Sequence, residues 1–303
     1  MSDDTQPAKR GIGWVFKGSK GLRAGWGIAI FTLVFSAAAV AIVFGLMALH
    51  LHKPKNDAFD PFSVIVQEGI VAGGLLVATI VTALIERRKL SEVNFGLKGF
   101  VPRILQGLLA GVGALSVLIG LLYLCHAITF GPVILHGADA WRWGAQWGLA
   151  FLLVGMAEEF MFRGYLLQTL ARGLNFRWAS IIMAALFGLA HGMNAGETVI
   201  GLAMVVMVAF VFTYSVWRTG TLWWALGFHA AWDWAQSFLY GVADSGHPAM
   251  GSLMTAKPAG PDWLSGGATG PEGSALACVV LLGVTALIHF TQRTPDERPS
   301  VKW

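Results

Sequence analysis

Six ionisable residues interrupt stretches of this chain that are otherwise apolar enough to lie in a lipid bilayer. They are Glu158, Glu159, Arg163, His191, His229 and Asp233. Ionisable groups at bilayer depth are costly unless they are paired or face water, so such a cluster indicates a functional site. Carboxylates and imidazoles are also common proton-transfer groups in catalysis. The sequence therefore favours acid–base chemistry within a membrane.

The first polar segment reads EEFMFR from Glu158 to Arg163. Residues four apart on a helix are neighbours, so Glu159 and Arg163 can neutralise each other. Glu158 points about 100° away from Glu159 around the helix and lacks that partner. Because desolvation favours proton uptake by an unpaired carboxylate, Glu158 is suited to accept a proton from water. The alternative is that both glutamates share Arg163.

The second polar segment reads FGLAHG from Phe187 to Gly192. His191 follows Phe187 by one helical turn, near the end of a short apolar helix. The glycines Gly188 and Gly192 leave backbone space around the imidazole. His191 is thus a candidate catalyst, and the alternative is a hydrogen-bonded structural histidine.

The third polar segment places His229 and Asp233 one helical turn apart on the same face. Such a pair can hold a histidine tautomer, ligate a metal or present two groups to a developing oxyanion. Packing alone is the alternative for this pair. The remaining histidines have no acidic residue four positions later, and we expect none of them to be a ligand or a catalyst: His50, His52, His126, His136, His247 and His289.

The composition is that of an integral membrane protein. Hydrophobic residues make up 55% of the 303 residues and charged residues 13%, and the mean hydropathy is +0.63. An ordinary soluble domain has about 25% charged residues, and a membrane-spanning helix needs about 20 apolar residues. Spans are predicted near 26–49, 63–85, 104–128, 143–170, 178–194, 198–217, 221–241 and 274–290. The predicted fold is an all-α polytopic membrane bundle of about eight transmembrane helices, with the catalytic site inside the bundle.

The positions of lysine and arginine predict the orientation, because positive residues in short loops stay on the cytoplasmic side. With eight spans and both termini in the cytoplasm, most of the 21 basic residues fall on that side. Four fall outside: Lys53, Lys55, Arg142 and Lys257. We expect the basic loops to contact anionic lipid headgroups, which explains the net charge of +4 without nucleic-acid binding.

We predict a single integral membrane domain over residues 1–303. Residues 1–24 and 291–303 are predicted cytoplasmic tails. Residues 242–273 are rich in Gly, Pro and Ser and should form an extramembrane loop with little regular structure, either a lid or a tether. Several glycines within predicted spans should let helices approach closely: Gly107, Gly111 and Gly113.

The three polar segments together resemble the CPBP family of intramembrane proteases, which includes the type II CAAX prenyl endopeptidases and bacteriocin-processing or immunity proteins. The family pattern is Glu-Glu-x-x-x-Arg, then Phe-x-x-x-His, then His-x-x-x-Asn/Asp, each on a separate span. It is matched here at Glu158 to Arg163, Phe187 to His191, and His229 to Asp233. The resemblance covers roughly residues 140–240, the expected catalytic core.

The resemblance implies proteolysis within or at the membrane. Glu158 and His191 would activate a water molecule, and His229 with Asp233 would stabilise the tetrahedral oxyanion. Glu159 and Arg163 would support the site. Many relatives carry Asn at the position of Asp233, and an ionised aspartate cannot donate a hydrogen bond to an oxyanion. Asp233 is therefore protonated, or orients His229, or helps to bind a cation.

Metal dependence is open at the level of sequence. Family members are commonly labelled metalloproteases, yet the HExxH motif is absent. Glu158, His191 and His229 are suitable ligand types for a divalent metal such as zinc with one open position. The same residues would also serve as a metal-free glutamate and histidine site.

The expected substrate is a membrane-associated protein or peptide, of which prenylated CAAX proteins are the best-known family example. We expect a multi-pass protein of a bacterial inner (plasma) membrane, in contact with lipid and not with nucleic acid. A non-catalytic scaffold or immunity protein of the same fold is one alternative, although it would be expected to lose a motif residue. An ion-coupled transporter is another, although transporters usually show internal repeats and none is visible.

Overall fold

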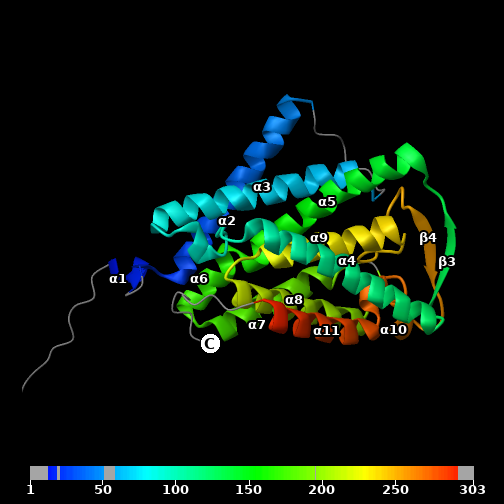
Figure 1. The fold of residues 1–303 in the computed structure, drawn as a ribbon. Helices are drawn as coiled ribbons and strands as arrows, with labels where there is room; N and C mark the ends of the chain where they lie inside the picture. The colour runs from blue at the N-terminus through cyan, green and yellow to red at the C-terminus, as the bar shows by residue number, and fades with distance from the viewer. Residues whose placement is uncertain (1–12, 19–20, 51–58, 195, 293–303) are drawn as a thin grey trace, which may run out of the picture.

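The computed structural model describes residues 13–18, 21–50, 59–194 and 196–292. Most of these residues form helices that pack into one bundle (Figure 1). The predicted tails 1–24 and 291–303 lie largely outside the described residues. Lys53 and Lys55, which we expected in an external loop, lie wholly outside them.

Long apolar helices form much of the bundle. Four are long and apolar enough to cross a membrane: α2 (Ala24–Ala48), α3 (Pro61–Glu86), α4 (Phe100–Leu124) and α8 (Val199–Thr219). Two shorter apolar helices accompany them, α7 (Phe176–His191) and α11 (Leu276–Thr291). All six coincide with predicted spans to within a few residues. The helical membrane bundle is thus confirmed, whereas the count of eight spans stays a prediction.

The fourth predicted span, 143–170, is not one continuous helix. The chain forms α5 (Gly137–Arg163) and then α6 (Tyr165–Gly173), separated by Gly164. The backbone at Gly164 leaves helical values, with φ −85° and ψ −129°. The side-chain amide of Asn94 donates a hydrogen bond to the Arg163 carbonyl at 2.6 Å. This bond from a distant segment satisfies the end of α5, so the prediction of a single helix was wrong.

Helix α9 (Trp223–Trp234) lies with its backbone almost against that of α4 and continues into a short π-helix, η2 (Ala235–Leu239). A methyl group on Gly107 would overlap the Trp224 carbonyl, and one on Gly227 would lie only 2.5 Å from the Ile104 carbonyl. Gly111 makes the same kind of close approach, as expected. Gly113 does not, because it faces open space. The small residues fix the position of α9, which carries His229.

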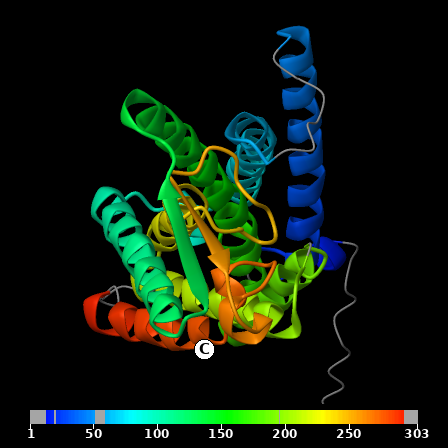
Figure 2. The same ribbon diagram turned by 90° about the vertical axis from the view of Figure 1, so that its right-hand side faces the viewer.

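Two small antiparallel sheets depart from the predicted all-α fold. Strand β1 (Lys17–Gly18), which follows the short helix α1 (Gly13–Phe16), pairs with β2 (Gly21–Leu22). Strand β3 (Ile128–Val133) pairs with β4 (Met254–Pro258). The second pair crosses one end of the helix bundle (Figure 2). Isoleucine, threonine and phenylalanine begin β3, and these residue types favour strands.

The predicted loop 242–273 has more regular structure than we expected. It contains β4, the short helix α10 (Asp262–Ser265) and the 3₁₀ turn η3 (Pro271–Gly273). The indole N–H of Trp147 on α5 also donates to the Met250 carbonyl at 2.8 Å. The loop is therefore anchored to both β3 and α5.

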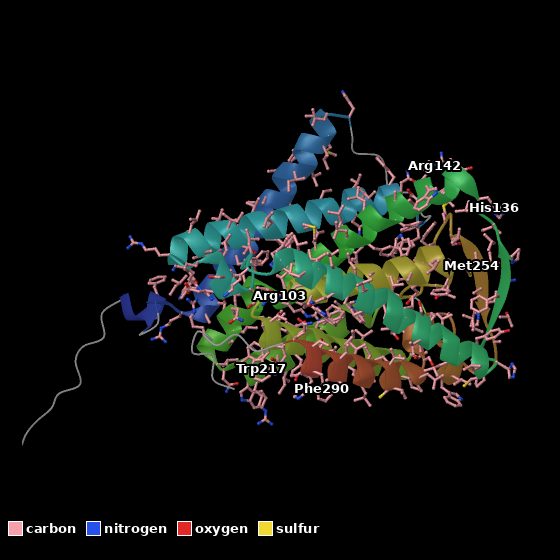
Figure 3. The ribbon with its side chains drawn as sticks, in the orientation of Figure 1. Arg103, His136, Arg142, Trp217, Met254 and Phe290 are labelled. Atoms are coloured by element: carbon pink, nitrogen blue, oxygen red, sulfur yellow. The ribbon has the colours of Figure 1, made fainter. Side chains whose placement is uncertain are left out.

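Apolar side chains are buried in one part of the bundle and exposed in another. Leu115, Phe212, Trp224 and Phe228 are buried where α4, α8, α9 and α11 meet. Helix α2 instead stands at the side of the bundle, with exposed apolar side chains such as Phe44. Such a surface suits contact with lipid. His136 and Arg142 mark the end of the bundle where β3 and β4 lie (Figure 3).

Another short element joins α3 to α4. The 3₁₀ turn η1 (Leu90–Val93) is followed by Asn94, which has a left-handed backbone with φ 71°. This conformation is tolerated by asparagine better than by most residues. The turn brings the Asn94 side chain to the end of α5, close to the polar segments.

Candidate active site

Helix α5 ends in a buried ion pair between Glu159 and Arg163. Arg163 Nη1 lies 3.0 Å from Glu159 Oε1, and the two side chains are 1% and 0% exposed. The guanidinium carbon also lies 4.4 Å from the centroid of the Phe187 ring and 5.3 Å from that of Phe212. Aromatic faces attract a cation, so they add to the stabilisation by the carboxylate. The structure therefore brings these two residues together as the sequence predicts.

His229 joins this ion pair to the other acidic residues. Its Nδ1 lies 3.1 Å from Glu159 Oε1. Because a carboxylate can only accept, the Nδ1–H group is the donor in this hydrogen bond. The other ring nitrogen, Nε2, lies 3.6 Å from Glu158 Oε2 and 3.5 Å from Asp233 Oδ2. Glu159 thus fixes the ring while Nε2 faces Glu158 and Asp233.

The backbone of α7 orients His191. Its Nδ1 lies 2.9 Å from the Phe187 carbonyl oxygen, to which it donates a hydrogen bond. The imidazole also packs against the Phe187 ring, with centroids 4.4 Å apart. Its Nε2 is left on the opposite edge, 3.9 Å from Glu158 Oε2. One bond to the preceding helical turn therefore aims the free nitrogen of His191 at the Glu158 carboxylate.

Glu158 lies between the two histidines. Its Oε2 atom is buried and has no hydrogen-bond partner among the described residues, while the side chain as a whole is 26% exposed. The separations of 3.6 and 3.9 Å from the two Nε2 atoms exceed direct hydrogen-bond length. A bridging water molecule suits groups at such separations when polar partners surround it. The carboxylate is therefore placed to hold water.

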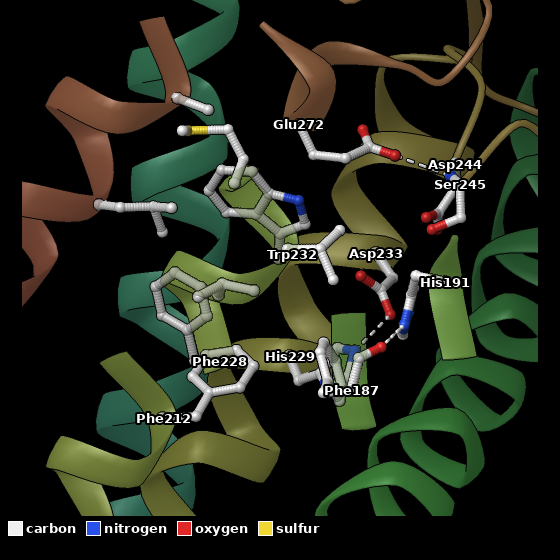
Figure 4. A pocket seen from close by; sticks show the side chains of 15 residues that line it. Phe187, His191, Phe212, Phe228, His229, Trp232, Asp233, Asp244, Ser245 and Glu272 are labelled. Carbon is white, nitrogen blue, oxygen red and sulfur yellow. Dashed lines mark hydrogen bonds and ion pairs between the residues drawn. The ribbon is translucent and has the colours of Figure 1, made fainter. Parts of the chain in front are cut away.

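Two cavities meet at these residues. The larger, of about 590 Å³, is lined by Glu158, His191, His229 and Asp233, and by residues of α3 and of the loop after η2. The smaller, of about 80 Å³, has His229, Asp233 and loop carboxylates on one side and aromatic rings on the other. Figure 4 shows Phe212, Phe228 and Trp232 on its apolar side. All four predicted catalytic residues therefore face one connected space.

Sequence reasoning missed several ionisable residues that line the cavities. Glu68 comes from α3, Asp244 and His247 from the loop after η2, and Glu272 from η3. His247 was expected to have no role, and the structure places it in the cavity wall. Glu68 was detectable because it is a charge inside the predicted span 63–85. The loop residues gave no local signal, since their proximity depends on the tertiary fold.

Hydrogen bonds orient the two loop carboxylates. Ser237 Oγ donates to Asp244 Oδ2 at 3.1 Å, and the Ser245 backbone amide donates to Glu272 Oε1 at 2.7 Å. The Gln236 amide also donates to Glu272. Burial raises the pKa of Asp244 to about 7, and the charge of Glu158 acts in the same direction, whereas the bond from Ser237 opposes it. Burial, and then the charge of Asp244, raises the pKa of Glu272 well above its ordinary value.

The candidate metal ligands meet at the Glu158 carboxylate. Among the described residues, no group of three or more histidine, cysteine, aspartate or glutamate side chains is arranged to hold a metal ion. The candidate ligands Glu158, His191 and His229 have suitable donor atoms. The Nε2 atoms of His229 and His191 lie 3.6 and 3.9 Å from Glu158 Oε2, and the metal dependence of this site stays a prediction.

Fold and site together define an integral membrane protein with a carboxylate- and histidine-lined site enclosed by apolar helices. Residues 140–235 match the family model described as "Type II CAAX prenyl endopeptidase Rce1-like". The resemblance expected from the three polar segments is thus confirmed for this part of the chain, which carries Glu158, His191, His229 and Asp233. The description names an endopeptidase.

A curated relative matches more weakly. The chain is 33% identical over 112 residues to "Uncharacterized protein YyaK" of Bacillus subtilis (strain 168). The match covers 35% of this chain and 37% of that protein. The chain therefore spans little more than a third of the length of this relative, whose name carries no activity.

Proposed function

We propose that this protein is an intramembrane endopeptidase that hydrolyses a peptide bond of a membrane-associated protein or peptide. The observation that carries the proposal is the position of the Glu158 carboxylate. It faces the Nε2 atoms of His191 and His229 and borders a cavity of about 590 Å³. The endopeptidase family description over residues 140–235 supports the same reaction.

In the proposed reaction, Glu158 and His191 position a water molecule in the cavity. The water oxygen attacks the scissile carbonyl carbon, and Glu158 takes the water proton as the C–O bond forms. The tetrahedral oxyanion accepts a hydrogen bond from His229 Nε2 when that nitrogen carries a proton. Glu158 then returns the proton to the leaving amine as the C–N bond breaks. The products are a carboxylic acid and an amine, which ionise to a carboxylate and an ammonium group, and the Glu158 carboxylate is regenerated.

The remaining polar residues act on His229 in this proposal. Glu159 holds the ring through Nδ1 and is itself fixed by Arg163. Asp233, at 3.5 Å from Nε2, favours the protonated imidazole and helps to orient it. We therefore propose that Asp233 orients His229. In this role the hydrogen bond to the oxyanion comes from His229, and Asp233 does not have to donate one itself.

The metal-dependent alternative keeps Glu158, His191 and His229 as ligands of a divalent ion such as zinc. The proposed steps use the protein groups alone, and the response to chelation distinguishes the two reactions. Prenylated CAAX-type proteins are the proposed substrates that the family description suggests. A non-catalytic scaffold of the same fold is less well supported, because each motif residue lines or supports the cavity.

The test is cleavage of a peptide library by the full-length protein purified in detergent. The library includes farnesylated CAAX peptides and their unprenylated counterparts, and mass spectrometry locates the cut bond. We expect cleavage by the wild type, a loss in Glu158→Gln and His191→Ala, and unchanged cleavage after chelation. Loss of activity on chelation with recovery on adding zinc would instead establish the metal-dependent reaction. Cleavage that persists in Glu158→Gln would overturn the assignment of the base.

A further inference from the structure

The loop after η2 adds carboxylates to the wall of the proposed catalytic cavity. Asp244 lines both cavities together with Asp233, and Glu272 lines the smaller one. Figure 4 shows Asp233, Asp244 and Glu272 on the same side of this space, with Ser245 bonded to Glu272. The loop is therefore part of the site and adds two carboxyl groups next to the proposed catalytic groups.

Asp233 is a buried carboxylate that faces His229. It is 8% exposed. Its ionic contact is His229 Nε2 at 3.5 Å through Oδ2, and the same nitrogen also faces Glu158. One imidazole cannot satisfy both acids in full. A buried carboxylate is costly without a paired cation or donors, so a further cation beside Asp233 would stabilise its ionised form.

The described wall of the larger cavity carries imidazoles but no permanently charged cation. Its described lining residues include Glu68, Glu158, Asp233 and Asp244, but no lysine and no arginine. Arg163 is engaged behind the wall by Glu159 and by aromatic rings. A lysine or arginine cation in this cavity would therefore be one that the described lining residues do not provide.

Hydrogen bonds from η2 hold the loop carboxylates Asp244 and Glu272 in place. The π-helix η2 places Gln236 and Ser237 so that both bond to the loop: Ser237 to Asp244, and Gln236 to Glu272 and to the Ala243 carbonyl at 2.7 Å. Gln236 is itself held by the Trp232 indole N–H at 2.9 Å. Short π-helices often occur at functional sites. Carboxylates fixed in this way lose little freedom when they bind a ligand.

We propose that Asp233 and Asp244 form a subsite for a lysine or arginine side chain of the substrate, close to the scissile bond. This rests on the proposed function, because the same cavity would hold that bond against Glu158. A basic side chain supplies the missing positive charge and several N–H donors. The acidic wall would also exclude substrates with an acidic residue at that position, since like charges repel.

Binding to a non-cleaving protein tests this proposal separately from catalysis. The full-length Glu158→Gln variant in detergent is titrated into fluorescently labelled farnesylated CAAX peptides. Each peptide carries either lysine or its neutral isostere norleucine at one of successive positions around the CAAX cysteine. Fluorescence anisotropy gives the Kd of each pair, and the wild type is assayed in parallel for cleavage of the same peptides.

At one position we expect lysine to bind about tenfold more tightly than norleucine, as for one charge-assisted hydrogen bond. Adding Asp244→Asn should reduce this ratio to near one, while Asp244→Glu should preserve it. The control Asp139→Asn removes an exposed carboxylate of α5, outside both cavities, and should leave the ratio unchanged.

Equal binding of lysine and norleucine at every position would overturn the subsite, as would a preference that survives Asp244→Asn. Absence of saturable binding by every peptide would also overturn it. The cleavage assay tests the proposed function separately. A lysine preference without cleavage by the wild type would contradict the protease reaction and support the subsite. Cleavage without a lysine preference would support the protease reaction and contradict the subsite.

Discussion

The two faces of His229 differ in how their acidic residues are partnered. On one face, Glu159 Oε1 contacts both His229 and Arg163, and the side chain is fully buried, with its Oε2 atom left without a hydrogen-bond partner among the described residues. On the other face, Glu158 and Asp233 line a cavity, and the Glu158 Oε2 atom has no hydrogen-bond partner in the described residues. Glu158 and Glu159 are adjacent in the sequence, yet Glu159 is enclosed in an ion pair and Glu158 lines the cavity. The comparison separates a group that holds the site from groups left available for chemistry.

The largest expected effect on stability comes from Glu159→Gln. This change leaves Arg163 buried without its carboxylate, which typically costs about 3–5 kcal/mol in free energy of unfolding. The matched variant Glu158→Gln, one position away, should leave stability close to that of the wild type because Glu158 lacks a tight ion pair. Thermal unfolding in detergent, followed by intrinsic tryptophan fluorescence, compares the two. Equal destabilisation by both variants would break the distinction between the two faces.

The next effect concerns the helix contact that positions His229. Gly227→Ala places a methyl group against the Ile104 backbone of α4 and should cost about 1–3 kcal/mol through overpacking. Gly113→Ala on the same helix α4 meets no atom within 4 Å and should be neutral or stabilising. The free energy of unfolding of both variants, measured with denaturant in detergent, checks this. An unchanged free energy of unfolding in Gly227→Ala would contradict the close packing of α9 against α4.

A smaller effect is expected in the pH dependence of stability. The pKa of Asp244 is raised from 3.8 to about 7 in the folded protein, so the folded state binds its proton more tightly than the unfolded state. The stabilisation is present below the unfolded pKa near 4 and is lost as the pH rises toward 7. Melting temperatures from pH 4 to pH 8 should therefore fall more for the wild type than for Asp244→Asn. Parallel plots of melting temperature against pH for the two proteins would show that the pKa of Asp244 is not raised by burial.

The smallest effect is expected at the surface of α5. Asp139 and Arg142 form an ion pair at 3.2 Å, with side chains 66% and 63% exposed. Exposed pairs contribute about 0–1 kcal/mol. Asp139→Asn should change the melting temperature very little, in contrast to Glu159→Gln in the same helix. A large loss would mean that this end of α5 is less exposed than it appears.

The sequence predicted most of what local pattern determines. The apolar runs predicted helices near their observed positions, and the four-residue spacing predicted the Glu159–Arg163 pair. It missed the break at Gly164, where the Arg163 carbonyl is bonded by Asn94 from a distant part of the chain. It missed Asp244 and Glu272 because a loop anchored by β3 and Trp147 carries them to the cavity. Contacts between distant segments leave no periodic signal.

The central claim is that Glu158, facing both histidines, activates water for peptide hydrolysis. The most direct measurement is single-turnover cleavage of the best peptide of the library by the wild type and by Glu158→Gln, at protein concentrations that saturate both. We predict that the Glu158→Gln rate falls by about 10²–10⁴-fold, the usual contribution of a general base, with peptide affinity and melting temperature preserved. A Glu158→Gln rate within a few-fold of the wild type would contradict the account.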